Sequence, residues 1–167
     1  MKSLVIYFSH TGESYINGTI RNITKGNTEI VVEKIKEITG ADLFKVEPVT
    51  AYPYNYQECC DVAKEELNNN IKRETKSELT SIADYDTIYI GGPVWLGHYP
   101  MPLLATLEKL DFSSKKVKPF TTHEGSGLGS VMSDVEKYCK NAIIESGLSI
   151  IGSNVNNAEE TLESWCK

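Results

Sequence analysis

The stretch "LVIYFSHTGESYINGTIRNITKGNTEIVVEKIKEITG" (residues 4–40) decides the fold, because it leads from a strand pattern to a helix pattern. Residues 4–8 form a short apolar run rich in β-formers, which is typical of a strand buried on both faces. Residues 27–40 carry apolar side chains at i, i+4 and i+7, which indicates an amphipathic helix that Gly40 can end. A buried strand followed by a helix predicts a unit of a parallel sheet.

The rest of the chain repeats this alternation. Further strands are expected at residues 42–48, 85–93 and 116–124 and within 142–151. Further helices are expected at residues 56–71, 101–110, 130–138 and 158–166. The pattern predicts an α/β fold in one domain, 1–167, with a doubly wound five-stranded parallel sheet covered by helices on both faces. Residues 9–26 are expected to form a loop, and loops of that length are usually functional or disordered.

Composition excludes several classes of protein. The chain has 167 residues with 40% hydrophobic and 24% charged side chains, as expected of one folded domain. The net charge of −6 argues against a general nucleic-acid binder. None of the four cysteines forms a Cys-x-x-Cys pair, so no metal site is expected. No signal peptide or membrane-spanning apolar run is recognisable, and we therefore expect a cytoplasmic protein.

Three strand ends are followed by unusual loops, rich in glycine, hydroxyl residues, tryptophan and histidine. Their sequences are "SHTG…KGNT" (9–28), "GGPVWLGHYP" (91–100) and "THEGSGLGS" (122–130). In a sheet of order 2-1-3-4-5, strands one, three and four are neighbours, so these loops should line one crevice. The first loop runs into a helix N-terminus, which favours an anion. Ordinary capping of that helix by Asn27 or Thr28 is the alternative interpretation.

Trp95 and the glycine-rich third loop are the remaining candidates for ligand contact. An indole at a strand end can pack against a planar heterocycle, and the alternative is a core tryptophan, as we expect of Trp165. His123 could equally be an ordinary polar loop residue. Ser126 does not lie in a nucleophile elbow, His123 does not begin a zinc-protease motif, and no Walker lysine motif occurs. No catalytic residue is assigned.

These loops together resemble those of the flavodoxin family, and especially the bacterial flavodoxin-like flavoproteins with "GGPVW…YPMP" and "THEGSG" loops. The phosphate loop of the family reads Ser/Thr-x-Thr-Gly-x-Thr, often with asparagine at the fifth position. Residues 9–12 match its first half and residues 26–28 its second half. The resemblance implies a short-chain flavodoxin whose phosphate-binding loop is interrupted by an insertion, residues 13–25.

The resemblance also implies FMN as cofactor and a set of residues around it. The phosphate would be surrounded by Ser9, Thr11, Gly26, Asn27 and Thr28. The second and third flavin loops would supply Pro93, Val94, Trp95, Leu96, Gly97, Thr122, His123, Glu124, Gly125, Ser126 and Gly127. Many flavodoxins place a tyrosine of the third loop on the outer ring face, but this loop has none. Tyr52, Tyr54 or Tyr99 could cover that face, or it could be open, and the insertion could reach over the cofactor through Tyr15, Ile16 and Ile20.

The function that the resemblance implies is a low-potential electron-transfer carrier. Its partners would be redox proteins, a reductase and an acceptor, whose basic docking surfaces the acidic chain would attract. A backbone carbonyl near Leu96 and Gly97 could accept a hydrogen bond from the N5–H group of the flavin. An FMN-dependent NAD(P)H quinone or flavin reductase is the first alternative, which an uncovered flavin face would favour. A non-catalytic receiver-type domain is the second, although no acidic cluster follows the first strand.

Overall fold

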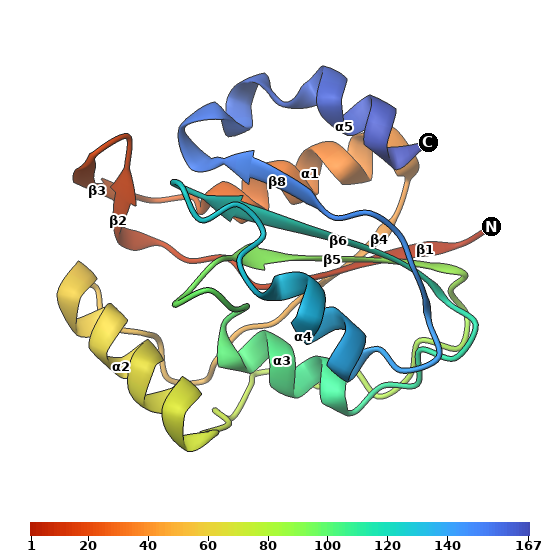
Figure 1. The fold of residues 1–167 in the computed structure, drawn as a ribbon, viewed down its shortest axis with the longest axis horizontal. Helices are drawn as coiled ribbons and strands as arrows, with labels where there is room; N and C mark the ends of the chain where they lie inside the picture. The colour runs from red at the N-terminus through yellow and green to blue at the C-terminus, as the bar shows by residue number, and fades with distance from the viewer.

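A parallel β-sheet forms the middle layer of the computed structural model, which describes residues 1–167 (Figure 1). Its central strands are β1 (Ser3–Tyr7), β5 (Thr87–Pro93) and β6 (Lys116–His123). The strand β4 (Asp42–Lys45) lies beside β1, and β7 (Ile143–Ile144) and β8 (Leu148–Ile151) both pair with β6. The expected order 2-1-3-4-5 is therefore confirmed, with its fifth position divided between two short strands.

The division of the fifth position has a local cause. Val117 pairs with Ile144, and Phe120 pairs with Leu148. Between these two pairs, the edge segment that contains β7 and β8 has one residue more than β6 has. Such an extra residue is a β-bulge, which bends a strand and interrupts its ladder. Gly147 lies within the bulge, and a Cβ there would be 2.7 Å from the sulfur of Met132.

The helices cover both faces of the sheet. One face carries α1 (Asn27–Thr39) and α5 (Glu159–Cys166), and the other carries α2 (Tyr56–Asn69), α3 (Met101–Glu108) and α4 (Val131–Tyr138) (Figure 1). A short 3-10 helix, η1 (Gly152–Asn157), leads into α5. Each helix begins and ends within two residues of its expected bounds. Among the strands, β4 differs most, since it ends at Lys45 before the proline that was expected to stop it.

Alternate residues of β1 enter two separate hydrophobic cores. Leu4 and Ile6 pack with α3 and α4, whereas Val5 and Tyr7 pack with α1 and α5. All four side chains are buried, and burying one aliphatic side chain of this size contributes about 1.5–3 kcal/mol. The uninterrupted apolar run of β1 therefore follows from its position in the middle of a sheet that is covered on both sides.

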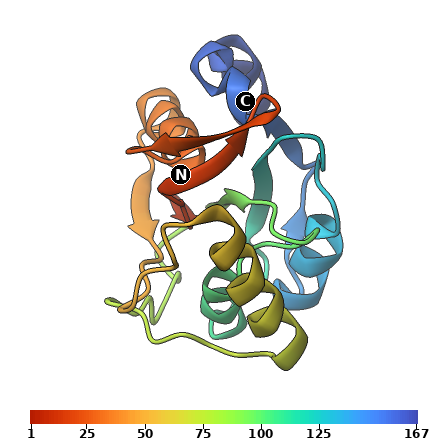
Figure 2. The ribbon, with the colours of Figure 1, turned by 90° about the vertical axis from the view of Figure 1, so that its left-hand side faces the viewer.

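Residues 9–26 were expected to form a loop, and this expectation was wrong. They contain a β-hairpin of β2 (Gly12–Ile16) and β3 (Thr19–Ile23), which pair only with each other. Asn17 and Gly18 form its two-residue turn, with φ values of 49° and 83°. Positive φ at both positions defines a type I′ turn, for which Asn-Gly is the preferred sequence. Figure 2 views the end of the molecule at which the hairpin and α2 lie.

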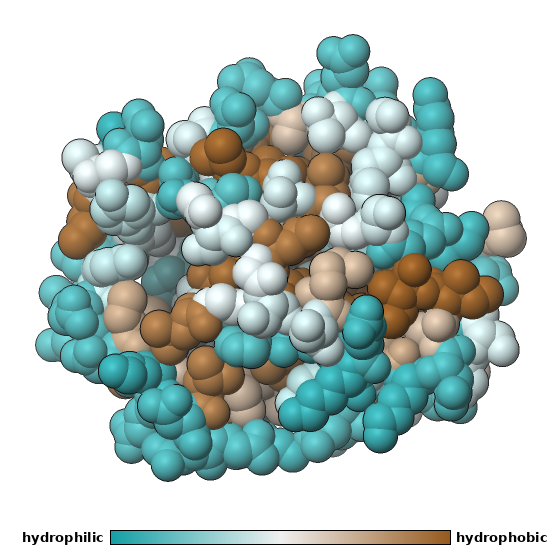
Figure 3. Space-filling view, in the orientation of Figure 1, coloured by the Kyte–Doolittle hydropathy of each residue, from teal (hydrophilic) through white to brown (hydrophobic).

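The surface is hydrophilic over much of the face drawn in Figure 3, and its apolar side chains lie in separate groups. Charged and polar side chains dominate the lower margin of this view, over α2 and α3. None of the helices combines the length and the apolar character that crossing a membrane requires.

Candidate functional site

A cleft of about 450 Å³ lies at the carboxyl ends of β1, β5 and β6. This volume falls in the range of small-molecule sites. The cleft is lined by His10, Glu13, Ser14, Tyr15, Ile23, Asn27, Thr28, Tyr56, Cys59, Cys60, Ala63, Pro93, Val94, Trp95, Leu96, Thr122, His123, Glu124 and Ser126. All three of the unusual loops contribute, so the expectation that they meet in one crevice is confirmed.

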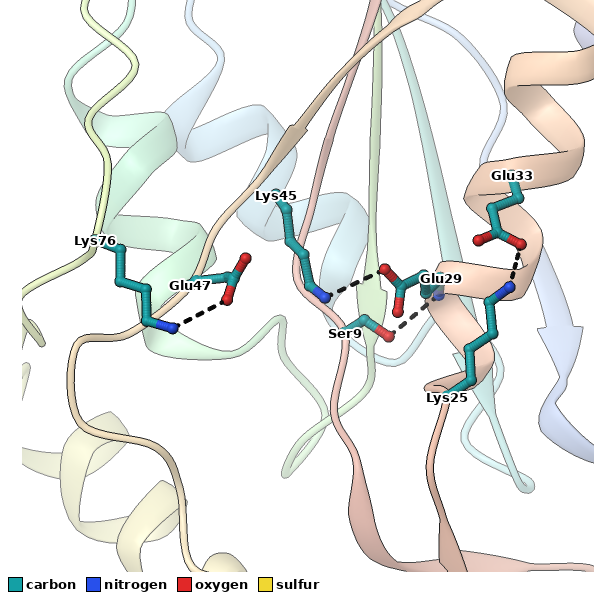
Figure 4. Close-up of polar contacts among 7 residues, drawn as sticks. All are labelled: Ser9, Lys25, Glu29, Glu33, Lys45, Glu47 and Lys76. Atoms are coloured by element: carbon teal, nitrogen blue, oxygen red, sulfur yellow. Dashed lines mark hydrogen bonds and ion pairs between the residues drawn. The ribbon is translucent and has the colours of Figure 1, made fainter.

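At one end of the cleft, the two halves of the interrupted loop come together. A Cβ at position 26 would lie 2.6 Å from the carbonyl oxygen of His10 and closer still to Ser9 Oγ, so only glycine fits there. Ser9 Oγ accepts a hydrogen bond from the backbone N–H of Glu29 at 3.1 Å (Figure 4). Residues that are far apart along the chain therefore form one continuous surface.

That surface is also the N-terminus of α1. The helix begins after Gly26, with no side-chain cap of its own, so the alternative interpretation, in which Asn27 or Thr28 caps the helix, does not hold. Ser9, which lies just after the end of β1, accepts the hydrogen bond from the N–H of Glu29. The N–H groups of Asn27 and Thr28 have no acceptor in the protein. Free N–H groups and the helix dipole both favour an anion at this point.

Two lysines near this anion site are already paired. Lys25 forms an ion pair with Glu33, and Lys45 forms one with Glu29 at 3.2 Å (Figure 4). Both lysines are thereby held by carboxylates on α1. The site offers backbone N–H groups and hydroxyls, which hold a phosphate through many hydrogen bonds.

The floor of the cleft is fixed by two buried threonines. Thr28 Oγ1 and Thr122 Oγ1 share a hydrogen bond of 2.8 Å, and both residues are almost fully buried. The neighbouring Thr121 Oγ1 donates to the carbonyl oxygen of Gly127 at 2.8 Å. The first and third loops are therefore joined directly by side chains.

The second loop forms a tight turn, in which the N–H groups of Trp95 and His98 donate to each other's carbonyl oxygens. Leu96 and Gly97 have φ values of 53° and 85°, again as in a type I′ turn. For a leucine this conformation costs about 1–2 kcal/mol. The turn exposes the Leu96 side chain beside the cleft, with 52% of its surface accessible.

Trp95 combines the two roles that the sequence left open. Its indole packs edge-on against Phe8, His10 and Tyr52, with ring centroids at 5.2, 5.4 and 4.9 Å. The residue is half-buried and also lines the cleft. An aromatic wall that is held rigidly from behind suits the binding of a planar ring. Trp165 was expected to be a core residue, but it is only partly buried and packs at the margin of the second core, against Tyr89 and Phe120.

The opposite wall of the cleft comes from the hairpin and from α2. Glu13 accepts a hydrogen bond from the N–H of Tyr56 at 2.8 Å, and its own N–H donates to the carbonyl oxygen of Tyr54 at 3.1 Å. At the hairpin tip, the N–H of Asn17 donates to the Glu124 carboxylate at 3.3 Å. The hairpin therefore spans the cleft from α2 to the third loop.

Comparison with known proteins decides the family. A family model described as flavodoxin matches residues 2–167. The chain belongs to the flavodoxin family. A search of curated proteins found no match.

Solved structures share the fold. A putative flavoprotein from Bacteroides uniformis is 24% identical, with 98% of this chain and 96% of that chain covered and a TM-score of 0.75. A putative flavoprotein from Bacteroides eggerthii is 23% identical, with coverage of 96% and 97% and a TM-score of 0.71. A flavoprotein from Lactobacillus acidophilus, solved in complex with FMN, is 23% identical, with coverage of 93% and 97% and a TM-score of 0.66.

Most residues expected to bind a flavin line the cleft of this flavodoxin, and six do not. The six are Ser9, Thr11, Gly26, Gly97, Gly125 and Gly127. Ser9 and Gly26 lie behind the anion site and shape it, whereas Thr11 is exposed. The carbonyl oxygen of Gly97 accepts a hydrogen bond from the N–H of Ser130 at 2.6 Å, so it is not free to meet a ligand.

The tyrosines that line the cleft differ from those suggested by the sequence. Tyr99 is fully buried and donates its hydroxyl to two backbone carbonyls, Tyr52 packs behind Trp95, and Tyr54 lies outside the cleft. The residues that do line it are Tyr15 of the hairpin and Tyr56 of α2, whose ring centroids are 6.4 Å apart. Of the apolar contacts expected from the insertion, Tyr15 lines the cleft but Ile16 and Ile20 do not.

The titratable groups in the cleft give no sign of an activated nucleophile. Burial lowers the pKa of His10 and raises the pKa of the Cys59 thiol to about 12. Cys59 Sγ lies 4.0 Å from His10 Nε2, but both groups are neutral at physiological pH. Burial also lowers the pKa of His123, and the charge of Glu124 partly opposes this shift. The cleft is suited to binding, and it lacks a cysteine–histidine ion pair.

A larger hollow of about 670 Å³ lies at the other end of the sheet, between α1 and α5, and it is a poorer flavin site. Its lining includes Lys34, Lys116, Lys118, Lys167, Glu37, Glu159 and Glu163. The C-terminal ends of α1 and α5 border it, and the negative end of a helix dipole disfavours phosphate. Lys118 is already engaged, since its Nζ donates to the carbonyl oxygen of Trp165 at 2.8 Å.

Proposed function

We propose that the cleft binds FMN and that the protein is an electron-transfer carrier. The observation that carries this proposal is the closure of the interrupted loop, through Ser9 and Gly26, into one anion site at the N-terminus of α1. A rigid aromatic wall, Trp95, lines the same cleft. A phosphate site and an aromatic wall in one cleft fit a flavin mononucleotide, and the chain belongs to a family named for flavoproteins.

The residues present fit the parts of FMN. The free N–H groups of Asn27 and Thr28 would hold the phosphate, and Ser9, behind them, would keep the helix N-terminus in place through its hydrogen bond from the Glu29 N–H. Trp95 would pack on one side of the ring, and Tyr15 and Tyr56 would shield the other side from water. FMN would supply the redox chemistry when bound, and the protein would supply binding, orientation and electrostatics.

The shape and charge of the protein favour a carrier over a reductase. The hairpin is hydrogen-bonded to α2 at its base and to Glu124 at its tip. This position of the hairpin narrows the space in the cleft for a second planar substrate. The net charge of −6 disfavours a reduced, anionic flavin and so favours a low potential. The same charge would attract a reductase and an acceptor with basic docking surfaces.

A reductive titration tests this proposal. The purified protein is saturated with FMN, freed of excess cofactor and titrated with dithionite while its visible spectrum is recorded. We expect one FMN per chain, two resolved one-electron steps and negligible oxidation of NADH or NADPH in the presence of a quinone. Rapid oxidation of reduced nicotinamide with a single two-electron step would identify a reductase. Failure to retain FMN would contradict both functions.

A further inference from the structure

The turn Trp95–His98, which forms one edge of the cleft, is tied to the start of α4. His98 Nδ1 lies 2.9 and 3.1 Å from the two carboxylate oxygens of Asp134, so its N–H is shared between them. The N–H of Tyr99 also donates to Asp134, at 3.4 Å. The N–H of Ser130 donates to the carbonyl oxygen of Gly97 at 2.6 Å. Two residues of the turn, Gly97 and His98, and the residue that follows it, Tyr99, are thus held.

Asp134 is an unusual residue for this position. It is buried, with 7% of its surface exposed, and His98 is the only basic side chain within ion-pair distance of it. A buried carboxylate is costly unless it is paired and hydrogen-bonded. A position in the first turn of α4 explains an acidic residue there, but it does not explain why the side chain is aimed at the turn.

The attachment decides which backbone group of the turn can meet a ligand. The carbonyl oxygen of Gly97 is occupied by Ser130, and a Cβ at position 129 would lie 2.6 Å from that oxygen, so α4 begins in direct contact with the turn. The carbonyl of Leu96 belongs to the central peptide of the turn, and it has no partner in the protein. Turn types differ by rotation of this central peptide. The contacts with Ser130 and Asp134 hold the C-terminal side of this peptide, and the N–H of Val94, which donates to the carbonyl oxygen of Thr122 at 3.3 Å, holds its N-terminal side. Its orientation is therefore fixed.

We propose that Asp134 is a positioning residue that acts through His98 to fix the turn Trp95–His98, and that it thereby sets the redox potential of bound FMN. The inference rests on the proposed binding of FMN. Asp134 does not line the cleft, and its effect is transmitted by the orientation of the Leu96 peptide. The redox potential of a bound cofactor depends on the ratio of the protein's affinities for its oxidised and reduced forms. A change in the turn that alters one of these affinities more than the other must therefore shift the potential.

Substitutions of the two partners test this role. Asp134→Asn removes the carboxylate charge, His98→Ala removes the attachment but keeps the charge, and His98→Asn places an amide N–H close to the position of Nδ1. For each variant we would measure the FMN dissociation constants in the oxidised and reduced states and the midpoint potential. We expect Asp134→Asn and His98→Ala to change the ratio of these constants in the same direction by about tenfold, which is about 30 mV for two electrons. In His98→Asn, the ratio of the two dissociation constants should return most of the way to that of the unsubstituted protein.

Glu145→Gln is a matched control, because it removes a carboxylate 3.4 Å from the buried Lys118, away from the cleft. Thermal unfolding of all variants separates loss of stability from a change in potential. Unchanged potentials in folded Asp134→Asn and His98→Ala proteins would overturn the inference, and so would a shift confined to Asp134→Asn, since that pattern indicates charge alone. If Asp134→Asn does not fold, the comparison of His98→Ala with His98→Asn decides the question. Failure of the unsubstituted protein to bind FMN would instead overturn the proposed function and this inference with it.

Discussion

The two walls of the cleft are built in different ways. The inner wall consists of strand ends and the start of α1, where Gly26 has no room for a side chain and Thr28 and Thr122 are buried and bonded to each other. The outer wall is the hairpin together with one side of α2, and the hairpin is attached through a few hydrogen bonds and leaves Tyr15 45% exposed. Val94 and Trp95 of the inner wall pack against the hydrophobic core, whereas the hairpin contributes no residue to either core. Binding of the cofactor should therefore depend on the inner wall far more than on the outer wall.

The largest expected effect is at Gly26, where a side chain would collide with Ser9 and His10. We expect Gly26→Val to weaken FMN binding by about a hundredfold or more, because the helix N-terminus and the first loop can no longer meet around the phosphate. Quenching of FMN fluorescence during titration measures the change. Gly18→Ala is the control in the outer wall, since it strains the hairpin turn, where φ is 83°, but its Cβ would meet no neighbouring atom. Equal losses in the two variants would contradict the distinction between the walls.

A smaller effect is expected from the buried threonine pair. Thr28→Val or Thr122→Val alone leaves one buried hydroxyl without its partner, which should lower the free energy of unfolding by about 1–3 kcal/mol. The double substitution removes both hydroxyls and should cost less than the sum of the two single changes. Urea denaturation of the four proteins gives the coupling energy. Additive losses would show that the two hydroxyls do not interact.

Removal of the hairpin should have a still smaller effect on binding. A deletion that joins Gly12 directly to Asn27 restores an uninterrupted phosphate loop and removes Tyr15 from the outer wall. We expect the protein to fold and to bind FMN with affinity reduced by about tenfold or less, because only the outer cover is lost. Calorimetric titration with FMN measures the affinity. Complete loss of binding in a folded deletion variant would show that the inner wall alone is not a site.

The smallest expected effect is a dependence of stability on pH that arises from His10. Burial lowers the pKa of this histidine below its usual 6.5 in the folded protein. Between the folded and unfolded pKa values the unfolded chain binds the proton more readily, so the free energy of unfolding should fall as the pH decreases below 6.5. His10→Asn should flatten the profile from pH 7 to pH 5, measured by urea denaturation. If the His10→Asn profile is identical to that of the unsubstituted protein, other titratable groups determine how stability depends on pH.

The comparison of the walls also separates what the sequence could predict from what it could not. The strands and the helices follow from local patterns. The meeting of the three loops follows from them only once the sheet order 2-1-3-4-5 is assumed, and together they place the inner wall. The outer wall depends on tertiary packing. Tyr56, Cys59 and Cys60 were assigned to an ordinary helix, because nothing in a helical pattern tells which neighbour its open side will face.

Two further features were visible only in the structure, for different reasons. The hairpin had a recognisable signal, Asn17-Gly18, but this dipeptide lay in a segment interpreted as a loop. The pair His98–Asp134 had no signal at all, since its members lie 36 residues apart and belong to a turn and a helix. The capping of α1 by Ser9 also had no signal in the sequence, because Ser9 follows β1 and is not adjacent to the helix in the chain.

The hairpin also has a consequence for the order in which the chain folds. A hairpin with a two-residue turn forms within about 1–10 μs, faster than contacts between distant segments. Pairing of Gly12 with Ile23 brings the two halves of the phosphate loop close together while β1 has still to find β5, its partner more than eighty residues away. Hairpin pairing within the insertion thus offsets the entropy cost of closing this loop before the parallel sheet assembles. We therefore expect the segment that divides the phosphate loop in the sequence to be the first to bring its two halves together during folding.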